Sequence, residues 1–283
     1  MRNDFILLVL SYNRPTNVLS LETLKKTNYD GNWALVVGED DPQLENYKKL
    51  YPEEHLAIFN KNDYKKDVDL CDQGGSDKIG LYARLACFDI AKSRGFKYFL
   101  EFDDDYVEYR YRVEYEGKLN YCWTTHITEC FEAAVEFLEN NKLVQSVAFA
   151  QGGDFICDLN AIKHPMEKCM NSWFCAVDRP IKFNGRMNDD VNAYVNGRCN
   201  GQLFLTCPHI SIKQKPTQSS GTGMADIYKD NGTYKKTLYT IIQHPSGVKV
   251  QMMGLTYYRL HHNVKKEFLY PCLISSQYKK HRN

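Results

Sequence analysis

Short apolar runs alternate with polar segments along the first hundred residues of the chain. Four of these runs have the length and composition of buried strands. They cover residues 5–11, 33–37, 56–60 and 98–102. The residues between them include helix-like segments at 16–26 and 77–93. This alternation predicts an α/β fold with a mostly parallel sheet and right-handed crossovers.

The helix predicted over residues 77–93 has one apolar face and ends at Gly95. The apolar positions on this face are Ile79, Tyr82, Ala83, Ala86 and Ile90. Arg84 lies off this face. The helix leads into the strand at residues 98–102, so a further strand-helix-strand unit favours a parallel sheet.

Polar residues follow three of the predicted strands, at 11–14, 39–41 and 103–105. In a parallel sheet the carboxyl ends of the strands meet at one edge, and ligands of α/β proteins bind at that edge. We therefore expect these three segments to line one site.

Three adjacent aspartates, Asp103, Asp104 and Asp105, end the fourth strand. Carboxylates this close repel one another, and a cation makes such a cluster tolerable. Their oxygens suit Mg²⁺ or Mn²⁺, which take a few acidic ligands together with phosphate oxygens and water. The alternative is an acidic turn that is simply solvated. The chain has no glycine-rich dinucleotide or P-loop motif, so a metal held by carboxylates is the expected partner of a phosphate.

The composition indicates a folded protein without a strong electrostatic preference for one kind of partner. With 283 residues, of which 43% are hydrophobic, the chain can bury a full core. Its formal net charge is only +1, so a polyanion would have to bind a local patch.

Ten cysteines form no C-x-x-C pair, and Cys87, Cys130 and Cys175 lie in apolar runs. This pattern is typical of reduced thiols in a cytosolic protein. The first apolar run is too short to span a membrane. We expect a soluble, cytoplasmic protein.

The second half adds two strand-like runs and a second pair of carboxylates. Residues 144–150 lead into Gln151, and residues 173–177 form another apolar run. Asp189 and Asp190 lie at the predicted start of a further helix. A helix N-terminus favours an ionised carboxylate by about 0.3–1 kcal/mol, so these residues could cap the helix or act as a general base.

Two features near the C-terminus have open interpretations. Residues 257–262 predict a strand in which His261 and His262 point to opposite faces, and one of them could complete a metal site or be an ordinary histidine. Residues 216–223, with the sequence PTQSSGTG, are either a surface loop or a lid that excludes water from a bound donor.

A family resemblance emerges over residues 5–106. Ser-Tyr-Asn-Arg-Pro ends the first strand, an acidic turn follows the second, and an Ala-Arg pair lies in the helix before the Asp-x-Asp cluster. This order resembles nucleotide-sugar glycosyltransferases of the GT-A fold. The resemblance implies a Rossmann-like mixed, mostly parallel sheet flanked by helices in a single domain. Residues 1–106 would bind the nucleotide-sugar, and residues 107–283 would bind the acceptor and perform catalysis.

The resemblance also implies a role for each group of polar residues. The nucleotide-sugar donor, favoured as a UDP-sugar, would contact Ser11, Tyr12, Arg14, Asp40, Arg84, Asp103, Asp104 and Gln151. Mn²⁺ or Mg²⁺ would be held by Asp103, Asp105 and His262, with His261 as the alternative histidine. Asp190, or as second choice Asp189, would be the general base of an inverting transfer.

Four motifs together look like the TET-associated DNA glycosyltransferases of bacteriophages, which are similar to the base J glucosyltransferases. The motifs are Ser-Tyr-Asn-Arg-Pro, Phe-Asp-Asp-Asp-Tyr, Arg-Met-Asn-Asp-Asp-Val-Asn and Arg-x-His-His. The similarity implies that the acceptor is a hydroxymethylated pyrimidine in DNA. For a phage protein it implies the host cytoplasm as location.

Cations and aromatic residues concentrate in the last third of the chain, where they could contact DNA phosphates or stack on an extruded base. The cations are Lys213, Lys215, Lys235, Lys236, Lys265, Lys266, Lys279, Lys280 and Arg282, and the aromatic residues are Tyr228, Tyr234 and Tyr239. Such charges also occur on ordinary solvated surfaces. Two alternatives therefore stay open: a glycosyltransferase that modifies polysaccharide or protein, and a noncatalytic DNA-binding or structural protein with this fold.

Overall fold

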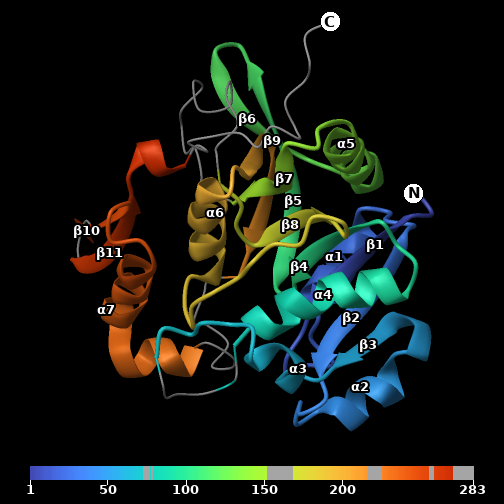
Figure 1. Cartoon of the computed structure of the whole chain (residues 1–283). Coiled ribbons are helices and arrows are strands. Elements are labelled where there is room, and N and C mark those ends of the chain that lie inside the picture. The colour runs from blue at the N-terminus through green and yellow to red at the C-terminus, as the bar shows by residue number, and fades with distance from the viewer. Residues whose placement is uncertain (73–76, 78, 152–167, 216–224, 255–257, 270–283) are drawn as a thin grey trace, which may run out of the picture.

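A nine-stranded mixed sheet lies at the centre of the molecule, with helices on both faces (Figure 1). The computed structural model describes residues 1–72, 77, 79–151, 168–215, 225–254 and 258–269, and for residues 225–233 the backbone alone. The strands of the sheet are β1 (Phe5–Leu10), β2 (Asn32–Gly38), β3 (Leu56–Phe59), β4 (Tyr98–Asp103), β5 (Tyr106–Tyr115), β6 (Lys118–Trp123), β7 (Val144–Gln151), β8 (Ser172–Ala176) and β9 (Leu203–Gln214). Their order is β3-β2-β1-β4-β8-β7-β9-β5-β6, and β5 and β8 run opposite to the other seven.

Alternate residues of the central strands enter two separate hydrophobic clusters. Phe5, Leu7 and Val9 of β1 belong to the cluster beneath α1 and α5, and Ile6 and Leu8 belong to the cluster beneath α4 and α6. Because β1 is covered on both faces, its sequence is a continuous apolar run. The helices are α1 (Leu19–Lys26), α2 (Leu44–Leu50), α3 (Asn62–Lys65), α4 (Leu81–Ser93), α5 (Ile127–Asn140), α6 (Asp189–Cys199) and α7 (Ala225–Gln243), with one-turn 3-10 segments at Glu53–His55 and Lys266–Phe268.

The ends of β1, β2 and β4 lie side by side at one edge of the sheet. Leu10 pairs in register with Val36 on one side and with Asp103 on the other. The segments after these strands therefore meet, as the sequence predicts. β7 and β9 point the same way, so Gln151 and Gln214 end at this edge as well.

The strands predicted in the first half and at residues 144–150 and 173–177 are confirmed to within a few residues. α4 begins at Leu81 rather than at residue 77, and Gly80, a poor helix former, lies directly before it. A short helix, α3, lies in the polar segment that follows β3. β8 inserts antiparallel between β4 and β7, a direction that an apolar run cannot reveal.

The C-terminal part of the described chain lies outside the large sheet (Figure 1). β10 (Val248–Met253) and β11 (Arg259–Val264) form a separate antiparallel pair, and α7 packs against both strands and against α6. Within the described residues, no helix combines the length and apolar character needed to cross a membrane. The eight described cysteines are free thiols, with Cys87 and Cys175 buried and Cys130 partly buried.

Candidate active site

The turn that carries the three aspartates is fixed to α1 through its backbone. Ser20 accepts a hydrogen bond from the backbone N–H of Tyr106 at 3.0 Å and donates one to the backbone carbonyl of Asp103 at 2.6 Å. The backbone N–H of Ser20 also donates to the carbonyl of Asp104 at 3.2 Å. A serine at the second position of α1 thus satisfies the polar backbone of the turn and sets the direction of its side chains.

Asp104 turns toward the end of β1. Its carboxylate accepts a hydrogen bond from the Ser11 hydroxyl at 2.9 Å and lies 3.2 Å from a guanidinium nitrogen of Arg14. The Tyr47 hydroxyl, 2.7 Å from Ser11 Oγ, also accepts from the backbone N–H of Arg14. Burial raises the pKa of Asp104 to about 6, against the lowering effect of Arg14 and Ser11. The structure thus brings together three residues predicted to bind the donor, Ser11, Arg14 and Asp104.

Asp41, not Asp40, contacts the polar segment after β1. The buried Asp41 carboxylate accepts hydrogen bonds from the backbone N–H groups of Asn13 and Gln43, each at 2.8 Å. Asp40 is exposed and pairs with Lys61 at 2.5 Å. Asp40 therefore makes no contact with the Ser11–Arg14 segment in the described structure, because the turn after β2 directs its side chain outward.

Two other residues that are predicted to contact the donor lie at the same edge of the sheet. Tyr12 is partly buried directly after Ser11, and Gln151 is partly buried at the end of β7. Both remain predictions. The predicted lid at residues 216–223 lies outside the described residues.

Asp103 and Asp105 face a different environment from Asp104. Burial raises the pKa of Asp103 to about 7, with Arg84 opposing and the neighbouring aspartates adding to the shift. Burial also raises the pKa of Asp105, whose side chain is hydrogen-bonded by Gln214. Asp105 Oδ1 is buried and has no hydrogen-bond partner among the described residues. An unpartnered buried carboxylate oxygen beside a second carboxylate fits a hard divalent cation.

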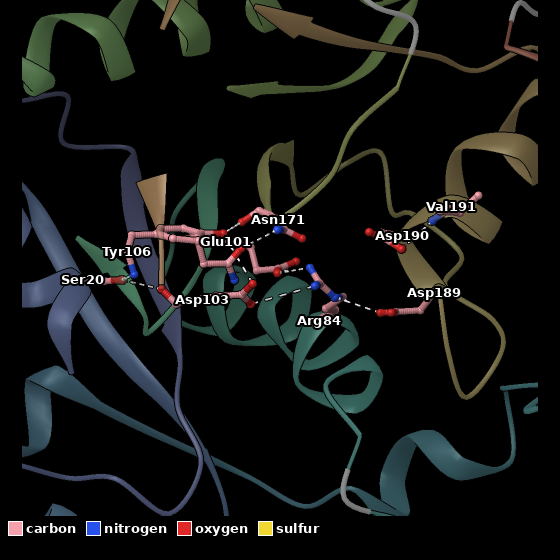
Figure 2. A network of polar contacts seen from close by, with 10 residues as sticks. Ser20, Arg84, Glu101, Asp103, Tyr106, Asn171, Asp189, Asp190 and Val191 are labelled. Carbon is pink, nitrogen blue, oxygen red and sulfur yellow. Dashed lines mark hydrogen bonds and ion pairs between the residues drawn. The ribbon is translucent and has the colours of Figure 1, made fainter. Parts of the chain in front are cut away.

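Arg84 lies between the acidic end of β4 and the start of α6 (Figure 2). It forms an ion pair with Glu101, and its Nε lies 2.9 Å from Asp189 Oδ2. Its Nη2 lies 4.0 Å from Asp103 Oδ1. Arg84 lies off the apolar face predicted for its helix, yet the residue is only 8% exposed, because Glu101, itself 1% exposed, neutralises it within the protein. Its predicted contact with the donor remains a prediction.

The two carboxylates at the start of α6 contact different partners (Figure 2). Asp189 points to Arg84, and burial raises its pKa while Arg84 opposes the shift. Asp190 Oδ1 accepts a hydrogen bond from the backbone N–H of Val191 at 2.8 Å. The preceding residue, Asn188, is in the left-handed region with φ 55°, which turns the chain sharply into the helix.

Residues from distant segments hold the start of α6. The Asn188 side-chain amide donates to the backbone carbonyl of Lys236 at 3.1 Å and lies 2.7 Å from Thr240 Oγ1, both on α7. Arg186 contacts the Asp72 carboxylate through two nitrogens at 2.7–3.0 Å, and Tyr239 of α7 donates to the same carboxylate. Loop, helix and C-terminal region thus converge on this turn.

His262 contacts this same turn and not the aspartates at the end of β4. Its Nδ1 lies 3.1 Å from the side-chain amide nitrogen of Asn188. This nitrogen is the donor, since it also donates to the backbone carbonyl of Lys236. Burial lowers the pKa of His262 to about 3, so the ring is neutral with its proton on Nε2. The described residues contain no group of three His, Cys, Asp or Glu side chains placed to hold a metal, so the predicted set of Asp103, Asp105 and His262 is not assembled.

The expectation that His261 and His262 point to opposite faces is wrong. Their rings stack with centroids 4.4 Å apart, and Nδ1 of His261 contacts the backbone carbonyl of His262.

The predicted DNA-contacting aromatic residues differ in exposure. Tyr234 is 63% exposed on α7, whereas Tyr239 is 8% exposed and bonded to Asp72, so Tyr239 is not available to stack on a base. The Tyr228 side chain and the cations Lys279, Lys280 and Arg282 lie outside what the structure describes. Lys213 lies 3.7 Å from Glu108, and Lys265 donates to the backbone carbonyl of Ser246.

Sequence reasoning missed Glu101, Asn188, Gln214 and Asp72. Glu101 carried a usable signal, because a lone carboxylate in the middle of a buried strand requires a cationic partner. Asn188 directly precedes two aspartates at a helix start, a position where the chain must turn. Gln214 and Asp72 gave no such signal, since each acts on a segment far away in the chain.

The sequence matches the model of the TET-associated glycosyltransferase family over residues 5–223. The chain belongs to this family. It is therefore a glycosyltransferase, and the alternative of a noncatalytic protein that merely keeps the fold is set aside. The α7, β10 and β11 region of this TET-associated glycosyltransferase lies beyond the matched residues.

The fold resembles that of a solved GT-A glycosyltransferase. A mannosyltransferase from Pyrobaculum calidifontis, solved with GDP-Man and Mn²⁺, has a TM-score of 0.50 at 12% identity, covering 88% of this chain and 66% of its own. Glucosyl-3-phosphoglycerate synthase from Mycobacterium tuberculosis, solved with Mg²⁺ and UDP, has a TM-score of 0.48 at 9% identity, covering 92% and 87%. Comparison of the sequence with curated proteins gives no match.

Proposed function

We propose that this glycosyltransferase moves a sugar from a nucleotide-sugar to the hydroxymethyl group of a modified pyrimidine in DNA, with a divalent metal and with inversion. The observation that carries the donor half of the proposal is the buried, unpartnered Asp105 Oδ1 beside Asp103 at the carboxyl edge of the sheet. The family membership supports a DNA acceptor. A UDP-sugar is the favoured donor.

Asp103 and Asp105 would hold Mn²⁺ or Mg²⁺, with the remaining positions left to diphosphate oxygens and water. When bound, the metal supplies stabilisation of the negative charge on the departing diphosphate. Ser11 and Arg14 would orient the nucleoside end of the donor, and Asp104 fixes Arg14 for that purpose. The neighbouring mannosyltransferase and synthase, which were solved with nucleotides and Mn²⁺ or Mg²⁺, are consistent with this assignment.

Asp190 would act as general base. The acceptor oxygen forms its bond to the anomeric carbon while the bond from that carbon to the diphosphate oxygen breaks. The hydroxyl proton passes to Asp190, and the electron pair leaves with the diphosphate. A hydroxyl is a weak nucleophile, and a positioned base contributes about 10²–10⁴-fold to such a step. Asp190 is favoured over Asp189 because Arg84 faces the Asp189 carboxylate.

The test offers several nucleotide-sugars, with and without Mn²⁺, to DNA that contains hydroxymethyluracil or hydroxymethylcytosine. Mass spectrometry of the digested DNA should detect one added sugar on the modified base. DNA of the same sequence with unmodified pyrimidines is the control and should gain no mass. Transfer to polysaccharide or protein, with no transfer to either modified DNA, would reject the DNA acceptor.

A further inference from the structure

Arg84 links the end of β4 to the start of α6 (Figure 2). Its guanidinium contacts Glu101 of β4 on one edge and Asp189 of α6 on the other. Glu101 and Arg84 come from the consecutive elements β4 and α4, whereas Asp189 comes from α6, about 90 positions further along the chain. Glu101 is almost fully buried, so it fixes Arg84 from within the core.

Asp189 and Asp190 are adjacent but are used differently. Asp189 Oδ2 faces Arg84 at 2.9 Å, and the side chain is 20% exposed. Asp190 bonds the backbone N–H of Val191, and among the described residues no ion pair joins it to a cation. A base must direct a free oxygen at the acceptor hydroxyl, and Asp190 can do this while Asp189 is directed at Arg84.

The opposite side of the same turn is also held. Asn188 donates to α7, and Arg186 pairs with Asp72. Gly185, with φ 86°, allows the approach of the Asn192 side chain, whose amide nitrogen would lie 2.4 Å from a Cβ at this position. Because these contacts hold one side of the turn, the ion pair between Asp189 and Arg84 determines how far the start of α6 can still move.

We propose that Glu101, Arg84 and Asp189 are positioning residues that orient Asp190, and that Asp189 is not the base. This inference rests on the proposed function, because it presupposes that Asp190 takes the proton of the acceptor. Arg84 acts through Asp189 on the geometry of the helix start. The three residues form one unit, so loss of any one of them releases the same constraint.

A double-mutant cycle tests this unit. Asp189→Asn and Asp190→Asn are each measured in the wild-type and in the Arg84→Lys background, with kcat and KM for transfer to modified DNA. Asp189→Asn should lower kcat about tenfold in the wild type and less than about twofold further in the Arg84→Lys enzyme, because the pair is already broken there. Asp190→Asn should lower kcat by about 10²–10⁴-fold in both backgrounds. An equal loss from Asp189→Asn in both backgrounds would overturn the proposal.

The pH profile separates positioning from proton transfer. The rise of kcat with pH that reports the base should persist in Asp189→Asn and disappear in Asp190→Asn, and the reverse result would make Asp189 the base. Asp178→Asn is the matched control, since Asp178 also lies near an arginine Nε, at 3.6 Å, but is 70% exposed. If Arg84→Lys does not fold, Glu101→Gln serves as the second background and should show the same loss of additivity.

Failure of the proposed function has a separate signature. If the wild-type enzyme transfers no sugar to modified DNA, the acceptor is wrong, and the same cycle is then measured on slow hydrolysis of the nucleotide-sugar. In that reaction water is the acceptor and the base is still required. Additive losses there would reject the positioning unit, and non-additive losses would support it independently of the DNA.

Discussion

The acidic residues at the end of β4 and those at the start of α6 are held by different kinds of contact. At the end of β4, Ser20 binds the backbone of the turn, and strand register places Asp103 beside β1. At the start of α6, groups from four separate segments make the contacts, including the Asp72 carboxylate, the Lys236 backbone carbonyl and the His262 ring. The first, the β4 region (residues 103–106), is held by the sheet. The second, the α6 region (residues 185–192), is held by tertiary contacts that α7 and β11 complete.

The two regions are therefore built from different parts of the chain. The β4 region is part of the central sheet, and we propose that its carboxylates hold a cation for the donor. The α6 region is completed by α7 and β11, which lie beyond the residues matched by the family model. Arg84 is the described side chain that contacts both regions.

Asp190→Asn should produce the largest effect and acts on the α6 region alone. We expect kcat to fall by about 10²–10⁴-fold while the affinity for the nucleotide-sugar stays within about threefold, because the proposed donor contacts belong to the β4 region. Single-turnover transfer and donor titration measure the two quantities. A large loss of donor affinity would show that the two regions are not separable.

Arg186→Ala should destabilise the protein by opening the α6 region. Arg186 is buried and binds Asp72 through two nitrogens, so its loss leaves a partly buried carboxylate with fewer partners. We expect the free energy of unfolding to fall by about 1–3 kcal/mol, measured by denaturant titration. Lys48→Ala, which removes an exposed pair on α2, is the control and should cost less than about 0.5 kcal/mol. Equal losses would mean that the Asp72 contact does not hold the turn.

Ser20→Ala is the corresponding change in the β4 region and should cost about 1 kcal/mol. The Tyr106 N–H would lose its partner, but the strands on either side of the turn remain paired. Hydrogen exchange of the Tyr106 amide should rise in the variant while exchange within β1 stays slow. Rapid exchange throughout β1 would contradict the view that the sheet itself secures this region.

The pH dependence of stability should report on the β4 region through Asp103. Burial raises the pKa of Asp103 to about 7 from its ordinary value of 3.8. A carboxyl whose pKa is raised by folding contributes fully to stability below its ordinary value, and this contribution is lost as pH rises toward the folded value. Without metal, Tm should therefore fall between pH 4 and pH 7, and Asp103→Asn should flatten this fall. An unchanged slope in the variant would mean that Asp103 is not the titrating group.

Most of the β4 region could be predicted from the sequence. Apolar runs located β1, β2, β3 and β4, and the rule for parallel strands brought Ser11, Arg14 and Asp104 together. The sequence could not show that Asp41, and not Asp40, contacts the segment after β1, because turn geometry decides which of two adjacent side chains faces inward. The predicted donor contact of Asp40 stays a prediction.

The α6 region was only partly predictable. The sequence placed Asp189 and Asp190 at a helix start, which the structure confirms. It could not reveal that Arg84 pairs with Asp189, that Tyr239 is buried, or that His262 faces Asn188. Each of these contacts joins residues more than 50 positions apart, and no local pattern encodes such a contact. β5, β6 and β9 also escaped prediction, since their alternating or charged residues resemble surface segments.

The central claim is that Asp103 and Asp105 hold a divalent cation for the donor diphosphate, and calorimetric titration of UDP with and without Mn²⁺ tests it most directly. Mn²⁺ should strengthen UDP binding at least about tenfold in the wild type and in the Asp178→Asn control. In Asp105→Asn this strengthening should disappear, and binding of Mn²⁺ alone should weaken in parallel. Wild-type-like Mn²⁺ dependence in Asp105→Asn would contradict the account.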